Sequence, residues 1–157
     1  MDCRIYAAES ESDFDKAKTI ILAYADFLNT DLSFQDFDNE MKTLSAMYGA
    51  SSRGCMLLAE LPDTIVGAVG LRFFSQGVAE MKRMFVLPEF QGQGIGSALM
   101  LAFINKAREL GYQSIRLDTI PELGKAIELY KKHRFTLTDP YRYNPHPKAQ
   151  FYELKVS

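Results

Sequence analysis

The chain has 157 residues, of which 47% are hydrophobic and 24% charged, which is the size and composition of one globular domain. A net charge of −2, without a Lys/Arg cluster that carries aromatic partners, argues against nucleic-acid binding. Cys3 and Cys55 lie far apart and have no metal-like spacing with His133 or His146, so neither a disulfide framework nor a metal site is indicated. No apolar run approaches the length of a membrane span, and we expect a soluble, cytoplasmic protein with no membrane partner.

The N-terminal segment predicts a strand followed by a helix. Residues 4–8 form a short strand pattern, and Ser10 with Asp13 forms a capping-box pattern, in which two side chains satisfy the first N–H groups of a helix. One face of this helix is predicted to be core, because apolar residues recur there at helical spacing. These residues are Phe14, Ala17, Ile21, Tyr24 and Leu28.

The next segment predicts a second helix with an acidic start. Ser33 with Asp36 again forms a capping-box pattern, and the helix is predicted to run to about Tyr48. Between residues 31 and 40 the segment carries four acids, two Phe and no basic residue. Acids are favourable in the first turn of a helix, so a solvated helix start accounts for this composition.

The remainder of the chain predicts a hairpin and then strands that alternate with helices. Pro62-Asp63 separates two apolar runs, which is a hairpin signature, and another strand follows Gln76-Gly77. A helix runs from a glycine-rich stretch to Leu110, with Gly111 as its C-cap. The order β-α-α-β-β-β-α-β-α-β-β mixes hairpins with helical crossovers and predicts one α/β domain over residues 1–157 with a mixed sheet. The predicted ranges are 55–60, 65–74, 115–118, 123–132, 135–137 and 151–156.

The glycine-rich stretch is the feature around which the rest is organised. Three alternate glycines, Gly92, Gly94 and Gly96, lead from an extended segment directly into a helical pattern. Unpaired N–H groups and the positive end of the helix dipole converge at such a point, which predicts a phosphate cradle at residues 91–97. The alternative is a tight strand-to-helix connection. No Gly-Lys-Ser/Thr follows, and Ser97 stands where a dinucleotide motif has its third glycine.

These residues resemble the GNAT superfamily of N-acetyltransferases, in particular small bacterial-type members. Gln91-Gly92-Gln93-Gly94-Ile95-Gly96 resembles the family's Q/R-x-x-G-x-G/A signature, and residues 80–86 resemble the strand that leads into it. Residues 126–132 are similar to its A-x-x-L-Y-x-K segment. The resemblance covers most of the chain. It implies a mostly antiparallel sheet splayed between the fourth and fifth strands, with acetyl-CoA in the gap, its pyrophosphate on the glycine loop, and no metal.

The resemblance implies direct transfer of an acetyl group to a primary amine of a small-molecule or peptide acceptor. An amine with a pKa near about 10 is mostly protonated at neutral pH, so a base must remove a proton. Glu80, eleven residues before Gln91, matches the family's catalytic glutamate; alternatively it is a strand carboxylate paired with Lys82 or Arg83. Tyr130 matches the tyrosine that protonates the CoA thiolate; alternatively it is a core residue.

The resemblance also implies the cofactor contacts. A splayed strand leaves backbone N–H groups unpaired, and the N–H of Val86 would face the thioester carbonyl as oxyanion donor. The implied cofactor-binding residues are Met84, Phe85, Val86, Gln91, Gly92, Gln93, Gly94, Ile95, Gly96, Ser97, Leu123 and Tyr130.

Two segments are implied to border the acceptor. The first two helices commonly do so in the family, so Phe34, Phe37 and the neighbouring acids would favour a cationic amine, against the simpler solvated helix start. The loop between the last two strands often closes over the acceptor. Tyr141, Tyr143 and Asn144 are therefore candidate contacts, and a rigid proline turn is the alternative.

Two departures from the family pattern leave other functions open. Leu123 stands where many members have Asn, and Arg134 stands where Gly usually precedes the Phe. These departures permit a non-catalytic acyl-CoA-binding module, and a dinucleotide-binding domain is a further alternative. A route through a cysteine is disfavoured because neither cysteine lies in the motifs. His133 is expected to face solvent rather than to act in catalysis. A homodimer through the final strands would follow the habit of the family.

Overall fold

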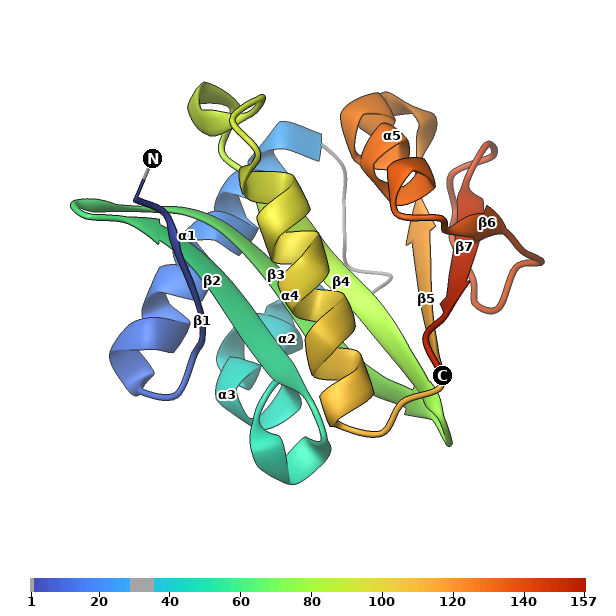
Figure 1. The fold of residues 1–157 in the computed structure, drawn as a ribbon, viewed down its shortest axis with the longest axis horizontal. Helices are drawn as coiled ribbons and strands as arrows, with labels where there is room; N and C mark the ends of the chain where they lie inside the picture. The colour runs from blue at the N-terminus through green and yellow to red at the C-terminus, as the bar shows by residue number, and fades with distance from the viewer. Residues whose placement is uncertain (1, 29–35) are drawn as a thin grey trace.

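The computed structural model describes residues 2–28 and 36–157, which form a seven-stranded sheet with helices on both faces (Figure 1). The strand order is β1-β2-β3-β4-β5-β7-β6. The elements are β1 (Arg4–Ala7), α1 (Glu11–Leu28), α2 (Phe37–Lys42), α3 (Leu44–Met47), β2 (Cys55–Leu61), β3 (Thr64–Ser75), β4 (Val78–Val86), α4 (Ile95–Glu109), β5 (Ser114–Thr119), α5 (Gly124–Lys132), β6 (Thr136–Leu137) and β7 (Gln150–Lys155). Three short 3-10 turns, η2 (Ala50–Ser52), η3 (Pro88–Phe90) and η4 (Pro121–Leu123), connect them.

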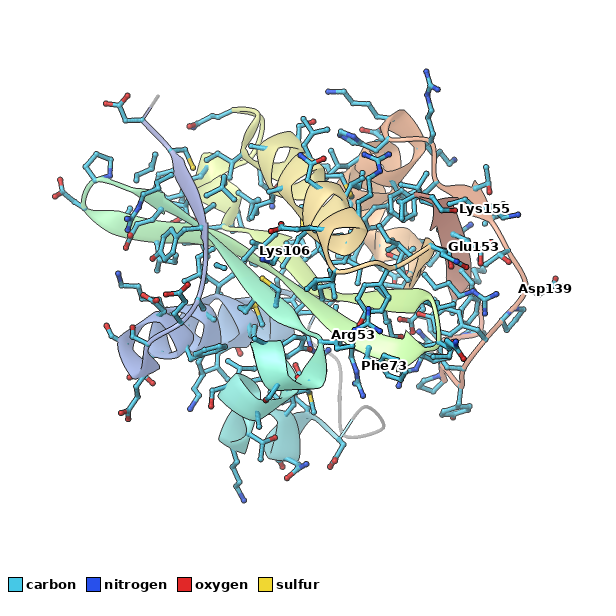
Figure 2. The ribbon with its side chains drawn as sticks, turned by 60° about the horizontal axis from the view of Figure 1, so that its bottom comes forward. Arg53, Phe73, Lys106, Asp139, Glu153 and Lys155 are labelled. Atoms are coloured by element: carbon cyan, nitrogen blue, oxygen red, sulfur yellow. The ribbon has the colours of Figure 1, made fainter. Side chains whose placement is uncertain are left out.

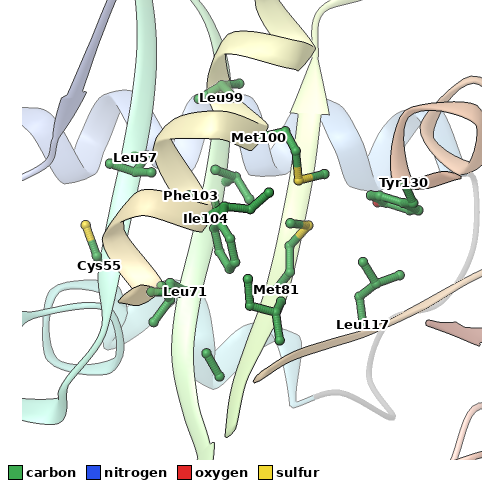
Figure 3. Packing of buried hydrophobic residues seen from close by; sticks show 14 of the residues in the cluster. Cys55, Leu57, Leu71, Met81, Leu99, Met100, Phe103, Ile104, Leu117 and Tyr130 are labelled. Carbon is green, nitrogen blue, oxygen red and sulfur yellow. The ribbon is translucent and has the colours of Figure 1, made fainter. Parts of the chain in front are cut away.

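The two faces of the sheet carry separate hydrophobic cores. On one face α4 buries Leu99, Met100 and Phe103 completely against the central strands (Figure 3). On the other face α1 buries Ile20 and Ile21 completely in a second cluster that includes residues of α3. Each such side chain contributes about 2 kcal/mol when it leaves water. The sheet is therefore held from both sides, and the loops at its ends start from fixed positions.

The sheet opens between β4 and β5. These two strands pair in parallel only from Val78 to Glu80 on β4, opposite Ser114 to Arg116 on β5. On its other edge β4 pairs with β3, and an extra residue forms a bulge at Arg83, whose φ is 58°. A bulge bends and twists its strand, so β4 turns away from β5 beyond this point (Figure 1). We call the unpaired stretch beyond Glu80 and Arg116 the β4–β5 divergence.

Most predicted elements are confirmed. The capping box of α1 is present, because Ser10 Oγ accepts from the Asp13 N–H at 3.1 Å and Asp13 Oδ2 accepts from the Ser10 N–H at 3.3 Å. The hairpin at Pro62-Asp63 joins β2 and β3. Gly111 follows α4 with a φ of 85° and donates its N–H to the Arg108 carbonyl. The splayed, mostly antiparallel sheet with one parallel pair is also confirmed.

The prediction of one second helix up to Tyr48 is wrong. Two short helices, α2 and α3, replace it, and the chain leaves helical geometry at Thr43, where φ is −122°. The Thr43 hydroxyl donates to the Asn39 carbonyl at 2.8 Å, which offers the backbone a local alternative to a continuing helix. Asp36 is the N-cap of α2 without a side-chain capping bond, and Ser33 lies outside the described residues.

Candidate active site

The glycine loop presents bare backbone at the start of α4. Gly94 is the N-cap of this helix with a φ of 86°, no side chain caps the helix, and Gly92 has a φ of 80°. A Cβ added to either glycine would meet nothing within 4 Å. Exposed N–H groups and the positive end of a 15-residue helix favour an anion at this point. The side chain of Ile95 is buried in the core, so its backbone alone is available to a ligand.

The start of α4 also contacts the end of α5. A Cβ added to Gly96 would lie 3.3 Å from the Leu129 side chain, so glycine permits the two helices to approach. Ser97 Oγ lies 3.1 Å from His133 Nε2 and accepts from Lys132 Nζ at 3.3 Å. Burial, with help from Lys132, lowers the pKa of His133. His133 is half-buried and contacts the glycine loop through Ser97, and its lack of a catalytic role stays a prediction.

Val86 directs its N–H into the β4–β5 divergence. Val86 stands opposite Gly67 of β3, and the next N–H, that of Leu87, donates to the Val66 carbonyl at 2.9 Å. In an antiparallel ladder this bond makes Gly67 and Val86 a non-hydrogen-bonded pair, so the Val86 N–H points away from β3. Gln91 Nε2 donates to the Val86 carbonyl at 2.9 Å and ties the glycine loop to the strand end.

Side chains from α1 and α5 approach the same region. Tyr130 is 5% exposed and lies at the margin of the core, beyond Met100 and on the side of Leu117 (Figure 3). Burial raises the pKa of Tyr130 well above its ordinary value, so its phenol keeps the proton. Burial also raises the pKa of Tyr24 to about 12, and its ring packs edge-on against Phe85. The helical spacing of Tyr24 predicts a core position on α1 and gives no sign of this contact with Phe85.

Glu80 has a buried carboxylate and lies where the β4–β5 divergence begins. Its side chain is 1% exposed, and its Oε2 accepts from the Tyr141 hydroxyl at 2.7 Å and from Arg142 Nη1 at 2.6 Å. Its Oε1 lies 4.0 Å from Arg72 Nε. Both hydrogen-bond donors to Oε2 thus come from the loop before β7, and Arg83, one of the two partners predicted from sequence proximity, binds Glu40 instead. Burial, and then the charge of Glu80, raise the pKa of Tyr141.

Arg83 binds a different acid. Its Nε and Nη2 donate to the two carboxylate oxygens of Glu40 at 2.9 and 3.1 Å, and the Tyr48 hydroxyl donates to Glu40 at 3.3 Å. The Arg83 guanidinium also lies 5.2 Å from the centre of the Phe37 ring. Phe37 and Glu40 thus contact a cation of the protein itself. Phe34, the other expected contact of this segment, lies outside the described residues.

Lys82 and Asp118 are site residues that sequence reasoning missed. Lys82 is 4% exposed, and burial lowers its pKa to about 8. Asp118, on β5 beyond the paired part, accepts from Asn144 Nδ2 at 2.9 Å. Asn144 therefore holds its loop to β5, whereas Tyr143 is 71% exposed. Charged residues that alternate with apolar ones in β4 and β5 were the available signal, because side chains of a strand alternate between faces.

Thr119 lies on β5 beyond the part that pairs with β4, and Leu123 lies in the turn that follows this strand. Thr119 is the last residue of β5, and its Oγ1 is buried without a hydrogen-bond partner among residues 2–28 and 36–157. A buried hydroxyl usually has a partner, so this atom is suited to meet a ligand. Leu123 ends the η4 turn before α5 and is partly buried. It offers apolar contact where the family pattern has an amide.

Two further observations concern the described part of the chain. No group of three or more His, Cys, Asp or Glu side chains in it is placed to hold a metal ion. None of its helices is long and apolar enough to cross a membrane.

Comparison with known sequences finds relatives along the whole chain. Residues 21–135 match the model of the acetyltransferase (GNAT) family. The chain is 36% identical to an uncharacterized N-acetyltransferase of Schizosaccharomyces pombe, over 98% of this chain and 94% of the relative. It is 28% identical to an uncharacterized N-acetyltransferase of Dictyostelium discoideum, over 94% and 97%.

Comparison with solved structures finds the same fold. A GNAT-family acetyltransferase from Staphylococcus aureus superposes with a TM-score of 0.82 and 22% identity over 99% of each chain. An acetyltransferase from Salmonella typhimurium, solved with its cofactor acetyl-CoA, superposes with a TM-score of 0.74 and 20% identity over 100% of this chain and 95% of that one.

Proposed function

Because the chain belongs to the GNAT family of acetyltransferases, we propose that it transfers the acetyl group of acetyl-CoA directly to a primary amine of a small-molecule or peptide acceptor. The protein is an acyltransferase, and acetyl-CoA is its cosubstrate. The observation that supports direct transfer is the β4–β5 divergence, which has the glycine loop at its end and the Val86 N–H directed into it. We propose that residues 1–157 serve this reaction as one domain.

The residues around the divergence suit the cosubstrate. We propose that the N–H groups of the glycine loop, from Gly92 to Ser97, hold the pyrophosphate, because no side chain competes for them at the helix start. Thr119 Oγ1 would gain the partner that it lacks within the described chain. Leu123 would contact the pantetheine arm through apolar surface.

In this proposal three groups of the chain act on the reacting atoms. Glu80 accepts a proton from the acceptor amine through Oε1, since Oε2 already accepts two hydrogen bonds. The amine nitrogen attacks the thioester carbonyl, and the Val86 N–H stabilises the oxyanion, an effect worth about 10²- to 10³-fold in rate. The C–S bond then breaks, and Tyr130 gives its proton to the departing thiolate. The nitrogen loses its second proton to solvent, the amide product and CoA thiol leave, and the proton on Glu80 replaces the one lost by Tyr130.

Ser97 allows a test of the phosphate cradle that does not disturb the helix. Ser97→Glu places a negative charge in the first turn of α4, where it favours the helix but repels phosphate. Ser97→Gln is the neutral control. We expect calorimetry to show an acetyl-CoA Kd at least about 10-fold weaker for Ser97→Glu than for Ser97→Gln, with a melting temperature of the Glu variant that is no lower.

Thiol release with a panel of primary amines then tests turnover. Release of CoA with at least one amine would support the transferase. Tight acetyl-CoA binding without release for any amine would instead favour the non-catalytic binding module. Equal acetyl-CoA affinity in the two Ser97 variants would contradict the cradle. The dinucleotide-binding alternative does not fit the described sheet, in which β4 and β5 form the one parallel pair.

A further inference from the structure

The carboxylate of Glu80 belongs to a cluster of charged side chains. Its other members are Arg72, Lys82, Asp118 and Arg142, which come from β3, β4, β5 and the loop before β7. The neighbouring pair of Arg83 and Glu40 is balanced within itself. A cation of the cluster that keeps hydrogen-bond donors for a ligand would favour one that brings a negative charge.

Arg142 is the cation of this cluster that is placed to meet a ligand. It donates to Glu80 through Nη1 alone, and its Nε and Nη2 make no hydrogen bond within residues 2–28 and 36–157. Its side chain is 25% exposed, against 1% for Glu80, so Arg142 is the more accessible member of this ion pair. Bonds from Tyr141 to Glu80 and from Asn144 to Asp118 hold the loop on both sides of Arg142. The guanidinium is thus fixed before any ligand arrives.

We propose that Arg142 binds a carboxylate of the acceptor, and that the acceptor is an α-amino acid or a conjugate that keeps both α-groups. This inference rests on the proposed function. The unused edge of a guanidinium matches a carboxylate in bidentate geometry. The Arg142 guanidinium contacts the Glu80 carboxylate directly, through Nη1 at 2.6 Å from Oε2, so one small molecule with its amine and its carboxylate a few bonds apart is suited to bind both residues. An α-amino acid does so, whereas a diamine or a protein lysine side chain does not.

A panel of matched acceptors tests this inference. Each set contains one α-amino acid, its α-amide and its decarboxylated amine, and CoA thiol release is measured at saturating acetyl-CoA. A site whose polar group loses its partner discriminates strongly, so we expect kcat/KM for the acid to exceed that for the amide by at least about 100-fold. Equal values for acid, amide and amine would overturn the inference while leaving the proposed function intact.

Two Arg→Lys variants separate recognition from structure. Arg142→Lys keeps the charge beside Glu80 but loses the planar fork, so kcat/KM for the acid should fall about 100-fold towards that of the amide, which should change little. Arg108→Lys is the control and should change neither value, because Arg108 lies on α4, the helix that carries Lys106 in Figure 2, and its Nε donates to the Val156 carbonyl at 3.0 Å. An equal fall of kcat/KM for acid and amide in Arg142→Lys would mean that Arg142 only holds the loop in place, and would overturn the inference.

A binding measurement covers the case in which Arg142→Lys folds poorly. N-acetyl amino acids, the products, should raise the melting temperature of the wild-type protein in the presence of CoA, and their amides should not. Equal effects of acid and amide would overturn the inference. Absence of turnover with every acceptor, while acetyl-CoA still binds, would overturn the proposed function and this inference with it.

Discussion

Lys82 gives the stability of the protein a pH dependence that can be measured. The side chain is 4% exposed, and burial lowers its pKa from 10.5 to about 8. The negative charge of Glu80 acts to raise this pKa, but its effect is smaller than that of burial. A tenfold loss of proton affinity corresponds to about 1.4 kcal/mol. Holding the ammonium form in the folded state at about pH 7 therefore costs about 3 kcal/mol relative to the unfolded chain.

The sign of the effect follows from which state binds the proton more tightly. Between pH 8 and 10.5 the unfolded chain holds more protons at Lys82 than the folded chain does, so this residue makes the free energy of unfolding rise with pH. The cost is fully present below pH 8 and vanishes above pH 10.5. Tyr24 acts in the opposite direction, because its raised pKa lets the folded state keep a proton that the unfolded state loses. A variant that changes Lys82 alone separates the two effects.

Urea unfolding of wild type and Lys82→Met at about pH 7 and about pH 9.5 is the assay. We expect the variant to be more stable by about 3 kcal/mol at the lower pH and by about 1.5 kcal/mol at the higher. Lys106→Met, at a lysine on α4 whose side chain is 30% exposed, controls for the change in net charge and should show no such dependence. A stability difference between Lys82→Met and wild type that stays constant with pH would refute this reasoning.

Further substitutions test the acid and the backbone. Tyr130→Phe removes the proposed acid but no side-chain hydrogen bond within the described residues. We expect kcat to fall about 10²- to 10³-fold, with acetyl-CoA affinity and melting temperature unchanged, and an unchanged kcat would exclude the role. Arg134 has a φ of 71°, and Arg134→Gly should raise the free energy of unfolding by about 1 kcal/mol in urea titrations. Arg53→Gly, at a φ of 57°, should lower the free energy of unfolding, because Arg53 also donates to the Leu110 carbonyl and stacks on Tyr112. Higher stability of Arg53→Gly, or lower stability of Arg134→Gly, would contradict this account.

Local signals account for the parts of the fold that the sequence predicted correctly. Ser10 and Asp13 form a capping box within four residues, and the glycines at 92, 94 and 111 adopt the left-handed conformations that their spacing around α4 requires. The break at Thr43 was missed because two weak helical turns and one continuous helix share the same apolar spacing. At the break, the Thr43 hydroxyl donates to the Asn39 carbonyl of the turn before it.

Contacts between distant segments were beyond the same reasoning. Glu80 was expected to pair with a neighbour in the chain, but its partners lie 61 and 62 residues later. They reach it because β7 lies next to β5, so the loop that leads into β7 passes over the charged face of β4. That adjacency belongs to the topology of the sheet and leaves no local trace. Arg142, which lies inside a loop singled out for its tyrosines, was overlooked for this reason.

The arrangement around Glu80 joins acceptor choice to proton transfer. Glu80 Oε2 accepts hydrogen bonds from Tyr141 and Arg142 of the loop before β7, which leaves Oε1 as the oxygen that can take a proton from the amine. A carboxylate bound to the outer edge of Arg142 would hold the acceptor with its amine on the Glu80 side, where Oε1 can reach it. An amine without that carboxylate lacks this anchor and loses the orientation as well as the binding energy. On this proposal the missing carboxylate lowers kcat as well as raising KM, whereas a purely attractive surface charge would change KM alone.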